Sequence, residues 1–333
     1  MHHDKLPTIG FVGAGLSALS AAVVLSRAGF SIRLFEKSRG PGGRMATRRE
    51  GPYGFDHGAQ YFTARDKCFV QEVQKWVAAG KVQRWEGRIG RLNEGRFQLQ
   101  SKEQDRFVGV PHMSSIGRHL AEGLDVRYNT CIGQIERGEK SWYLLSDRER
   151  HRCDIVLIST PPRQALDLLP RDSSLGSIFS QVELSPCWAL MVVFEHSLDL
   201  CFDGAFVQDA PLSWVARNSS KVGRGSAECW VLHASPEWST AHLQMESEVV
   251  ADVLIDAFFR AAGSARVEPL FVKAHRWRYS IAEAPLKCGS LWNAEERIGL
   301  CGDWCNSLRV EGAFLSGIDL AERIIAIGGG TPL

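Results

Sequence analysis

The feature that most constrains the fold is a glycine-rich turn between a short apolar strand and a helix of small residues. The pattern predicts a strand over Thr8–Val12, a helix that ends near Ala28, and a second strand over Ser31–Phe35. Continuous apolar runs are typical of parallel strands that are covered on both faces. We therefore expect a β-α-β unit in the first part of the chain.

This turn matches the GxGxxG/A fingerprint of dinucleotide-binding folds. Gly13 allows the tight turn, Gly15 lets the backbone approach a pyrophosphate, and Ala18 is small enough for the helix to pack against the strand. The first turn of the helix offers free N–H groups and the positive end of its dipole to phosphates, and the Ser17 hydroxyl adds a donor. The turn therefore predicts a nucleotide cofactor.

Three further elements favour a flavin over a nicotinamide cofactor. Glu36 ends the second strand and would accept hydrogen bonds from a ribose diol, which argues against a 2′-phosphate there. In segment 42–45 (GGRM) the glycines let the loop pass close to the cofactor, and Arg44 would reach the pyrophosphate. Asp303 would hold a ribityl hydroxyl, and the next helix would face the N1/C2=O edge of an isoalloxazine. A surface Arg44 and a helix-capping Asp303 are the alternative interpretations.

Composition excludes several other classes of protein. The 333 residues are enough for about two domains. With 39 Lys and Arg against 38 Asp and Glu, the chain has no long-range field to attract nucleic acid or an anionic membrane. The 9 cysteines are scattered without a CxxC pair, so we expect neither a disulfide framework nor a metal site. Without a signal-peptide pattern over Met1–Pro7 or an apolar run long enough to span a membrane, a cytoplasmic location is expected.

The rest of the chain alternates between helical and strand patterns. We expect an α/β fold in which a Rossmann-like FAD-binding domain carries an inserted α+β substrate domain. The FAD-binding domain is assigned to 1–66, 105–162 and 293–333, and the substrate domain to 67–104 and 163–292. Helices are predicted over Lys67–Ala79, Ser114–Ala121, Ser239–Ala262 (one long helix) and about Glu311–Ala326.

These motifs resemble the flavin amine oxidase superfamily. The resemblance lies in segments 13–18, 42–45 and 302–303 together with Glu36. Four more segments resemble the renalase family within that superfamily, most closely its bacterial form: 56–63 (DHGAQYFT), 113–116 (MSSI), 230–234 (WVLHA) and 275–279 (HRWRY). The similarity runs in order from about residue 8 to 325.

The resemblance implies non-covalent FAD in a p-hydroxybenzoate-hydroxylase-like fold. Cys301 and Cys305 lie near the region where monoamine oxidases attach their flavin, but not in that family's motif. Motif by motif, Ser17, Gln60 and Tyr61 are implied as FAD contacts alongside Arg44. The full set of expected cofactor residues is Gly13, Ala14, Gly15, Ser17, Ala18, Glu36, Lys37, Gly43, Arg44, Met45, Gln60, Tyr61, Ile132, Asp303, Val310, Glu311 and Ala313.

The resemblance also implies the reaction. Its substrates are isomeric dihydronicotinamide dinucleotides that carry their hydride at ring position 2 or 6, and its products are NAD(P)+ and, after reoxidation by oxygen, hydrogen peroxide. Such a transfer needs a donor ring held parallel to the isoalloxazine, which flat aromatic walls achieve. We therefore expect Trp277 and Tyr279 as walls and His233 as a polar group at the ring edge. Candidate substrate contacts are Thr63, Arg65, Trp214, Arg217 and Arg278, with the arginines directed at phosphates.

Other interpretations remain open at this point. Core packing is the competing role for each tryptophan, and a hydrogen-bonded core histidine is the competing role for His233. An amine oxidase, a flavin desaturase and a non-catalytic flavin-binding NAD(H) sensor are the alternative functions. The expected partners are a small dinucleotide and molecular oxygen, and the sequence sets neither the preferred isomer, the NAD or NADP form, nor the oligomeric state.

Overall fold

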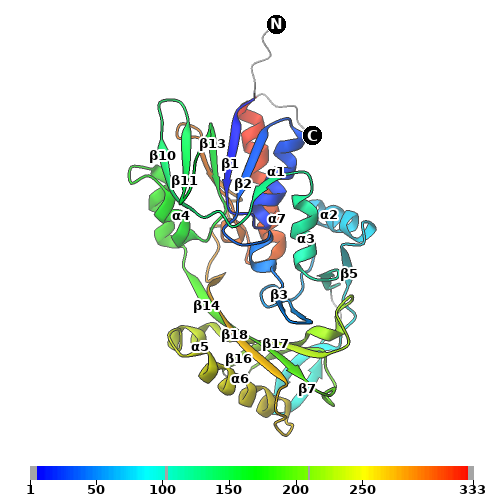
Figure 1. Ribbon diagram of the computed structural model, residues 1–333. Coiled ribbons are helices and arrows are strands. Elements are labelled where there is room, and N and C mark those ends of the chain that lie inside the picture. The colour runs from blue at the N-terminus through cyan, green and yellow to red at the C-terminus, as the bar shows by residue number, and fades with distance from the viewer. Residues whose placement is uncertain (1–5, 102–103, 209–210, 329–333) are drawn as a thin grey trace.

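The computed structural model describes residues 6–101, 104–208 and 211–328, and it contains two large sheets, one above the other in Figure 1. Of the segment Met1–Pro7, in which we found no signal-peptide pattern, residues 1–5 lie outside the described part. Across the described ranges, no helix combines the length and apolar character that a membrane crossing demands. The fold is mixed α/β, as predicted.

The upper sheet has six strands in the order β19-β20-β13-β1-β2-β9. All its neighbours pair in parallel except β19 and β20. Helix α1 (Leu16–Arg27) connects β1 to β2, which confirms the predicted β-α-β unit. The strand bounds are β1 Thr8–Val12, β2 Ser31–Phe35, β9 Asp125–Arg127, β13 Ile155–Ile158, β19 Leu291–Asn293 and β20 Ile298–Leu300.

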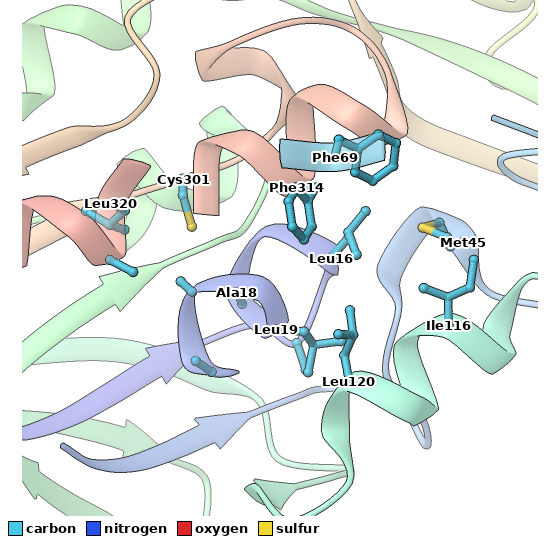
Figure 2. Close-up of a cluster of buried hydrophobic side chains, with 14 of the residues drawn as sticks. Leu16, Ala18, Leu19, Met45, Phe69, Ile116, Leu120, Cys301, Phe314 and Leu320 are labelled. Carbon is cyan, nitrogen blue, oxygen red and sulfur yellow. The ribbon is translucent and has the colours of Figure 1, made fainter. Parts of the chain in front are cut away.

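Helices α1 and α7 (Val310–Gly328) pack closely together beside this sheet. The Ser20 hydroxyl on α1 donates to the Phe314 carbonyl on α7 at 3.2 Å. Figure 2 shows the surrounding core, in which Leu16, Phe314 and Phe69 come from three different helices. These helices are α1, α7 and α2 (Lys67–Ala78), and α3 (Ser114–Ala121) adds Ile116 and Leu120.

The lower sheet has seven strands in the order β18-β14-β17-β16-β15-β6-β7. Alternate residues of β14 face opposite sides, because side chains alternate along a strand. Leu190 and Val192 pack with the helix α6 (Ser247–Ala262), whereas Met191 and Val193 pack with Phe55 on the other face. The strand bounds are β6 Ile89–Asn93, β7 Arg96–Leu99, β14 Leu184–Phe194, β15 Gly204–Val207, β16 Leu212–Arg217, β17 Glu228–Ala234 and β18 Phe271–Ala282.

Smaller elements complete the fold. Three strands form a separate antiparallel sheet in the order β10-β11-β12, beside the short helix α4 (Pro162–Leu168). Two further strand pairs, β3 with β4 and β5 with β8, connect the upper and lower parts. Their bounds are β3 Arg48–Glu50, β4 Tyr53–Phe55, β5 Val82–Arg84, β8 Phe107–Gly109, β10 Ile132–Arg137, β11 Trp142–Ser146 and β12 Arg150–Cys153.

Two expectations differ from the structure. The long helix predicted over Ser239–Ala262 is wrong, because α5 (Pro236–Ala241) and α6 (Ser247–Ala262) are separate helices. The Trp188 indole donates to the His242 carbonyl at 3.1 Å, and Arg276 donates to the Leu243 carbonyl. Side chains of the sheet thus occupy the carbonyls of residues 242 and 243, which would accept main-chain N–H groups in a continuous helix.

The second difference concerns α2, which we had assigned to the substrate domain. The Phe69 ring lies 5.2 Å from the Phe314 ring of α7, so α2 belongs to the core around α1 and α7. The upper sheet holds β1, β2, β9, β13, β19 and β20, and the lower sheet holds β6, β7 and β14 to β18. Strand β19 begins at Leu291, so the upper sheet includes two residues that we assigned to the substrate domain. The remaining residue ranges of the two domains stay a prediction.

The close packing of α1 against α7 gives a first testable prediction. A Cβ at Gly317 would lie 2.1 Å from the Ser17 carbonyl oxygen and 2.4 Å from the Ser20 hydroxyl. We expect Gly317→Ala to lower the free energy of unfolding by about 1–3 kcal/mol, because the helices would have to separate. Thermal unfolding followed by circular dichroism measures this. Gly176→Ala is the control, since nothing lies within 4 Å of that position; equal effects in both variants would contradict the prediction.

Candidate active site

A cavity of about 2300 Å³ begins where β1 and β2 end and extends to strands β17 and β18 of the lower sheet. Its walls come from the loops after β1, β2 and β20 and from strands β6, β15, β17 and β18. In parallel sheets, ligands bind at the carboxyl ends of the strands, so the cavity lies where the sequence predicted a cofactor.

Two glycine-containing loops, 13–15 after β1 and 42–43 after β2, line one end of this cavity. Gly13 has φ +98° and its N–H donates to the Phe35 carbonyl at 2.8 Å, so the tight turn requires glycine. Gly15 is the N-cap of α1 and supplies no side-chain cap, which leaves the first N–H groups of the helix free to bind an anion. A Cβ at Gly43 would lie 3.5 Å from the Gly15 Cα, so the second loop lies directly against the first.

Glu36 is buried at the same end and organises both neighbouring loops. Its carboxylate accepts the Ala14 N–H at 2.9 Å and the Ser38 N–H at 2.8 Å. A carboxylate has about four acceptor positions, so two bonds leave it able to accept ribose hydroxyls as well. Lys37 and Ile132 line the cavity beside it.

Arg44 and Asp303 form a bidentate ion pair on the cavity wall. The two N–H···O distances are 2.8 and 2.7 Å, and the same guanidinium donates to the Ser280 carbonyl of β18 at 2.7 Å. Asp303 begins the short helix η4 (Asp303–Cys305) and also accepts the N–H of Trp304. The pair therefore joins the loop after β2, the turn after β20 and the lower sheet.

The hydrogen-bond donors at the end of the cavity near β1 and β2 are suited to FAD. Among the described residues, the buried hydroxyls of Thr160 and Ser114 have no hydrogen-bond partner, and both residues line the cavity. Unpartnered donors are costly unless a ligand satisfies them. Cys301 and Cys305 are fully buried and do not line the cavity, which agrees with non-covalent binding.

Three aromatic side chains close the other end of the cavity. The ring centroids of His57, His275 and Trp277 are 4.7 to 4.9 Å apart in pairs. The Trp277 indole donates to the His57 carbonyl at 3.0 Å, and Nε2 of His233 lies 3.0 Å from the same oxygen. One main-chain oxygen thus orients two of the predicted catalytic side chains.

The histidines at this end are neutral. Burial lowers the pKa of His57 to about 3 and the pKa of His233 to about 4. Burial, with the nearby Arg48 charge, also lowers the pKa of His275. Near pH 7 these side chains therefore supply planar surfaces and hydrogen bonds but no positive charge.

A buried ionic cluster lies behind the histidines. Arg224 forms an ion pair with Asp56, and Lys221 Nζ lies 3.7 Å from the same carboxylate. Lys221 also donates to the Gln60 side chain at 2.7 Å, and burial lowers the pKa of Lys221 to about 7. This cluster fixes the segment that carries His57, because removing one partner would leave a buried charge unpaired.

The structure brings most of the predicted site residues to the cavity wall. At the cofactor end these come from α1, the loop after β2, and the start of α7; at the other end they come mainly from β17, β18 and the segment after His57. The predicted residues that line the cavity are Gly13, Gly15, Ser17, Glu36, Lys37, Gly43, Arg44, Met45, Tyr61, Thr63, Arg65, Ile132, His233, Trp277, Arg278, Tyr279, Asp303, Val310 and Ala313.

Arg217 and Trp214 do not line the cavity, contrary to our expectation. Arg217 pairs with Glu228 and donates to the Leu198 carbonyl at 2.8 Å, on the sheet face opposite to Trp214, so it is not placed to bind substrate phosphates. Trp214 is buried between Tyr61 and Phe206, with ring centroids at 5.5 and 4.7 Å, so its role is packing.

Four predicted cofactor residues also do not line the cavity. Ala14 and Ala18 are fully buried and allow the close packing of α1, which is the role the fingerprint gives them. Gln60 points toward Lys221 and the Asp56 carbonyl rather than into the cavity. The Glu311 carboxylate accepts the N–H groups of residues 65 and 66 at 2.6 and 2.8 Å, so its side chain positions that loop instead of contacting FAD.

Sequence reasoning missed several wall residues. His275 lies two positions before Trp277 on β18, so strand periodicity could have placed it on the same face. Arg91 and Phe206 lie on β6 and β15, and only the pairing of these two distant strands brings them together. Lys221 lies in a polar turn, and nothing in that pattern predicts its burial.

The β-α-β unit, the buried acid at the end of β2 and the loops that meet at the Arg44–Asp303 pair are the features of a flavin-dependent oxidoreductase of the Rossmann type. The chain belongs to the family described as flavin containing amine oxidoreductase, whose model matches residues 92–325, and residues 12–74 match an NAD(P)-binding Rossmann-like domain. FAD is the cofactor of this family.

Individual known proteins are similar to this chain at low sequence identity. The L-amino-acid oxidase of Daboia russelii is 25% identical over 160 residues, which are 42% of this chain and only 31% of the oxidase. A protein assigned by name as a protoporphyrinogen oxidase of an Exiguobacterium species has a TM-score of 0.79 at 15% identity, covering 96% of this chain and 99% of its own. Putrescine oxidase bound to putrescine has a TM-score of 0.73 at 15% identity, covering 96% of this chain and 99% of its own. These structural similarities show the fold.

The Arg44–Asp303 pair gives a prediction about cofactor affinity. Arg44→Met removes the cation and leaves the Asp303 carboxylate unpaired beside the flavin site. We expect the Kd for FAD to rise about tenfold or more, which corresponds to about 1.4 kcal/mol. Equilibrium dialysis with flavin fluorescence measures it. Arg33→Met is the control, because it breaks the exposed Arg33–Asp125 pair outside the cavity; an unchanged Kd for Arg44→Met would contradict the assignment.

The buried histidines predict how stability depends on pH. His57 and His233 take up protons in the folded state only near pH 3 and 4, but near pH 6.5 when unfolded. Below pH 6.5 the unfolded state binds more protons, so we expect stability to fall toward pH 4 by up to about 1.4 kcal/mol per pH unit for each group.

Urea unfolding at several pH values tests this dependence. His233→Asn should flatten the decline below pH 6.5, whereas the exposed control His196→Asn should leave it unchanged. Identical slopes for the wild type and His233→Asn would contradict the prediction.

Proposed function

We propose that this protein oxidises isomeric dihydronicotinamide dinucleotides, as the resemblance to the renalase family implies. The substrate would carry its hydride at ring position 2 or 6 and leave as NAD(P)+. When bound, FAD would supply the hydride acceptor at N5; oxygen would be the final oxidant and, with a proton from solvent, would be reduced to hydrogen peroxide.

The charge of the cavity is the observation that carries this proposal. Among the described lining residues the acids are Glu36, Asp167 and Asp303. Glu36 accepts main-chain N–H groups and Asp303 pairs with Arg44. Asp167 lies on α4, which packs beside β10 at the cofactor end. The substrate end is lined by neutral histidines and by arginines at positions 65, 91, 106 and 278; Arg276 also lies on β18, but its guanidinium is turned to Trp188 and the Leu243 carbonyl on the other face of the sheet. This field favours an anionic dinucleotide over a cationic amine.

The remaining residues at this end would position the donor ring. His275, Trp277 and Tyr279 occupy alternate positions of β18, so they present flat surfaces along one strand. His233 is neutral, and its Nε2–H is directed to the His57 carbonyl. The dihydropyridine nitrogen supplies the electrons that expel the hydride, so the reaction needs placement of the ring and no protein base.

Anaerobic stopped-flow reduction tests the proposal. Purified FAD-loaded protein should lose its flavin absorbance with a 2- or 6-dihydronicotinamide dinucleotide at least about tenfold faster than with ordinary NADH or with a primary amine, because the resemblance implies donors that carry the hydride at these ring positions. Fast reduction by putrescine or an amino acid, without reduction by the isomers, would replace the proposal with amine oxidation. Flavin that no donor reduces would favour a non-catalytic NAD(H) sensor.

A further inference from the structure

One row of side chains crosses the lower sheet from the aromatic end of the cavity to its rim, by which we mean the part lined by Phe206, Arg91 and Gln98. Strand pairing aligns His275, Ala189 and His233 and then Trp214. The same register continues through Phe206 and Arg91 to Gln98 on β7. Residues that are directly opposite on neighbouring strands share a face, so this row forms the floor below this part of the cavity. His275, His233, Phe206, Arg91 and Gln98 line the cavity, whereas Ala189 and Trp214 are buried between them.

The length of this row exceeds what a single ring needs. His233 on β17 and Arg91 on β6 are separated by three strand spacings, which amount to about 14 Å. A donor ring between His233 and Trp277 would cover only the first part of the floor. The remainder, which includes Phe206, Arg91 and Gln98, lines the same cavity and lies beyond the reach of a simple amine or a single nicotinamide ring.

The far part of the floor presents an aromatic surface to the cavity. The Phe206 side chain is 39% exposed and lines the cavity, although its ring centroid lies 4.7 Å from that of Trp214. A large aromatic ring that is supported underneath and open above is the arrangement on which nucleic-acid bases stack.

Arginines surround this aromatic surface. Arg91 follows directly from Phe206 across the sheet, and Arg106 and Arg65 line the adjoining wall. Arg106 lies 5.6 Å from the centre of the Tyr61 ring, and its guanidinium donates to the Gln100 side chain. Guanidinium groups that converge on one cavity are suited to the oxygens of a diphosphate.

We propose that this rim is a second subsite, which binds the diphosphate and the second base of a dinucleotide substrate. Arg65, Arg91 and Arg106 bind the diphosphate, and the purine stacks on Phe206. The inference rests on the proposed function, because it assumes that the donor ring occupies the aromatic end. It adds that substrate affinity depends on the nucleotide half that does not react.

The first experiment compares whole and truncated substrates. Each dihydronicotinamide dinucleotide isomer is tested beside the corresponding mononucleotide, which lacks the second nucleotide, in anaerobic reduction of the FAD-loaded enzyme. We expect the mononucleotide to need at least about tenfold higher concentration for half-saturation, with a smaller change in the limiting rate, because stacking and diphosphate contacts are lost.

Two rim variants locate the effect. Phe206→Ser should raise the half-saturating concentration of the dinucleotide about fivefold or more and leave that of the mononucleotide unchanged. Arg91→Gln should also raise that of the dinucleotide about fivefold or more, with a smaller rise for the mononucleotide, which keeps one phosphate. Arg96→Gln is the matched control, since Arg96 is an exposed arginine on the neighbouring β7 that does not line the cavity. Equal half-saturation of whole and truncated substrates in the wild type would overturn the subsite while leaving the proposed function intact.

Binding of ADP provides a readout that does not depend on the reaction. Calorimetry with fully FAD-loaded enzyme, so that the cofactor site is filled, should detect ADP binding to the wild type and to Arg96→Gln but at least about fivefold weaker binding to Phe206→Ser. Equal ADP binding by Phe206→Ser and the wild type, or none by the wild type, would overturn the subsite. If ADP binds as expected but no isomer reduces the flavin, the rim is a nucleotide site and the proposed function fails.

Discussion

The active site depends on one bidentate ion pair, between Arg44 and Asp303. Arg44 follows β2, Asp303 follows β20, and the Ser280 carbonyl on β18 accepts from the same guanidinium. The loop that is predicted to face the cofactor phosphates and the strand that carries Trp277 are therefore fixed by a single group. Charged hydrogen bonds of this geometry are stronger than neutral ones, which lets three distant segments share one rigid arrangement.

The cofactor end was predictable because its signals are local. Gly13, Gly15 and Glu36 occupy fixed places in a strand-turn-helix-strand pattern, and the backbone geometry of that pattern determines where they face. The substrate end was predicted less well, because the face of a strand residue depends on register. Arg217 and Trp214 both lie on β16, but opposite parity directs Arg217 toward Glu228 and away from the cavity.

Long-range contacts explain the other differences from expectation. The apolar pattern over 239–262 is helical throughout, but Trp188 and Arg276, from strands far away in sequence, donate to the carbonyls of residues 242 and 243 near its N-terminal end. Lys221 is fully buried because Asp56 and Gln60, over 150 residues earlier, supply its partners. The residues around Lys221 in the sequence do not indicate these distant partners, so the burial of this lysine could be recognised only from the structure.

The assembly of the upper sheet from separated segments also has a consequence for biosynthesis. Strand β1 pairs with β13, which in turn pairs with β20, and Asp303 and α7 come after all of them in the chain. Contacts of such large sequence separation form slowly and require the later segment to have left the ribosome. Cofactor capture is therefore expected to follow translation of the α7 segment, and nascent chains that stop before it would hold β1 and its glycine turn without a partner that completes the flavin pocket.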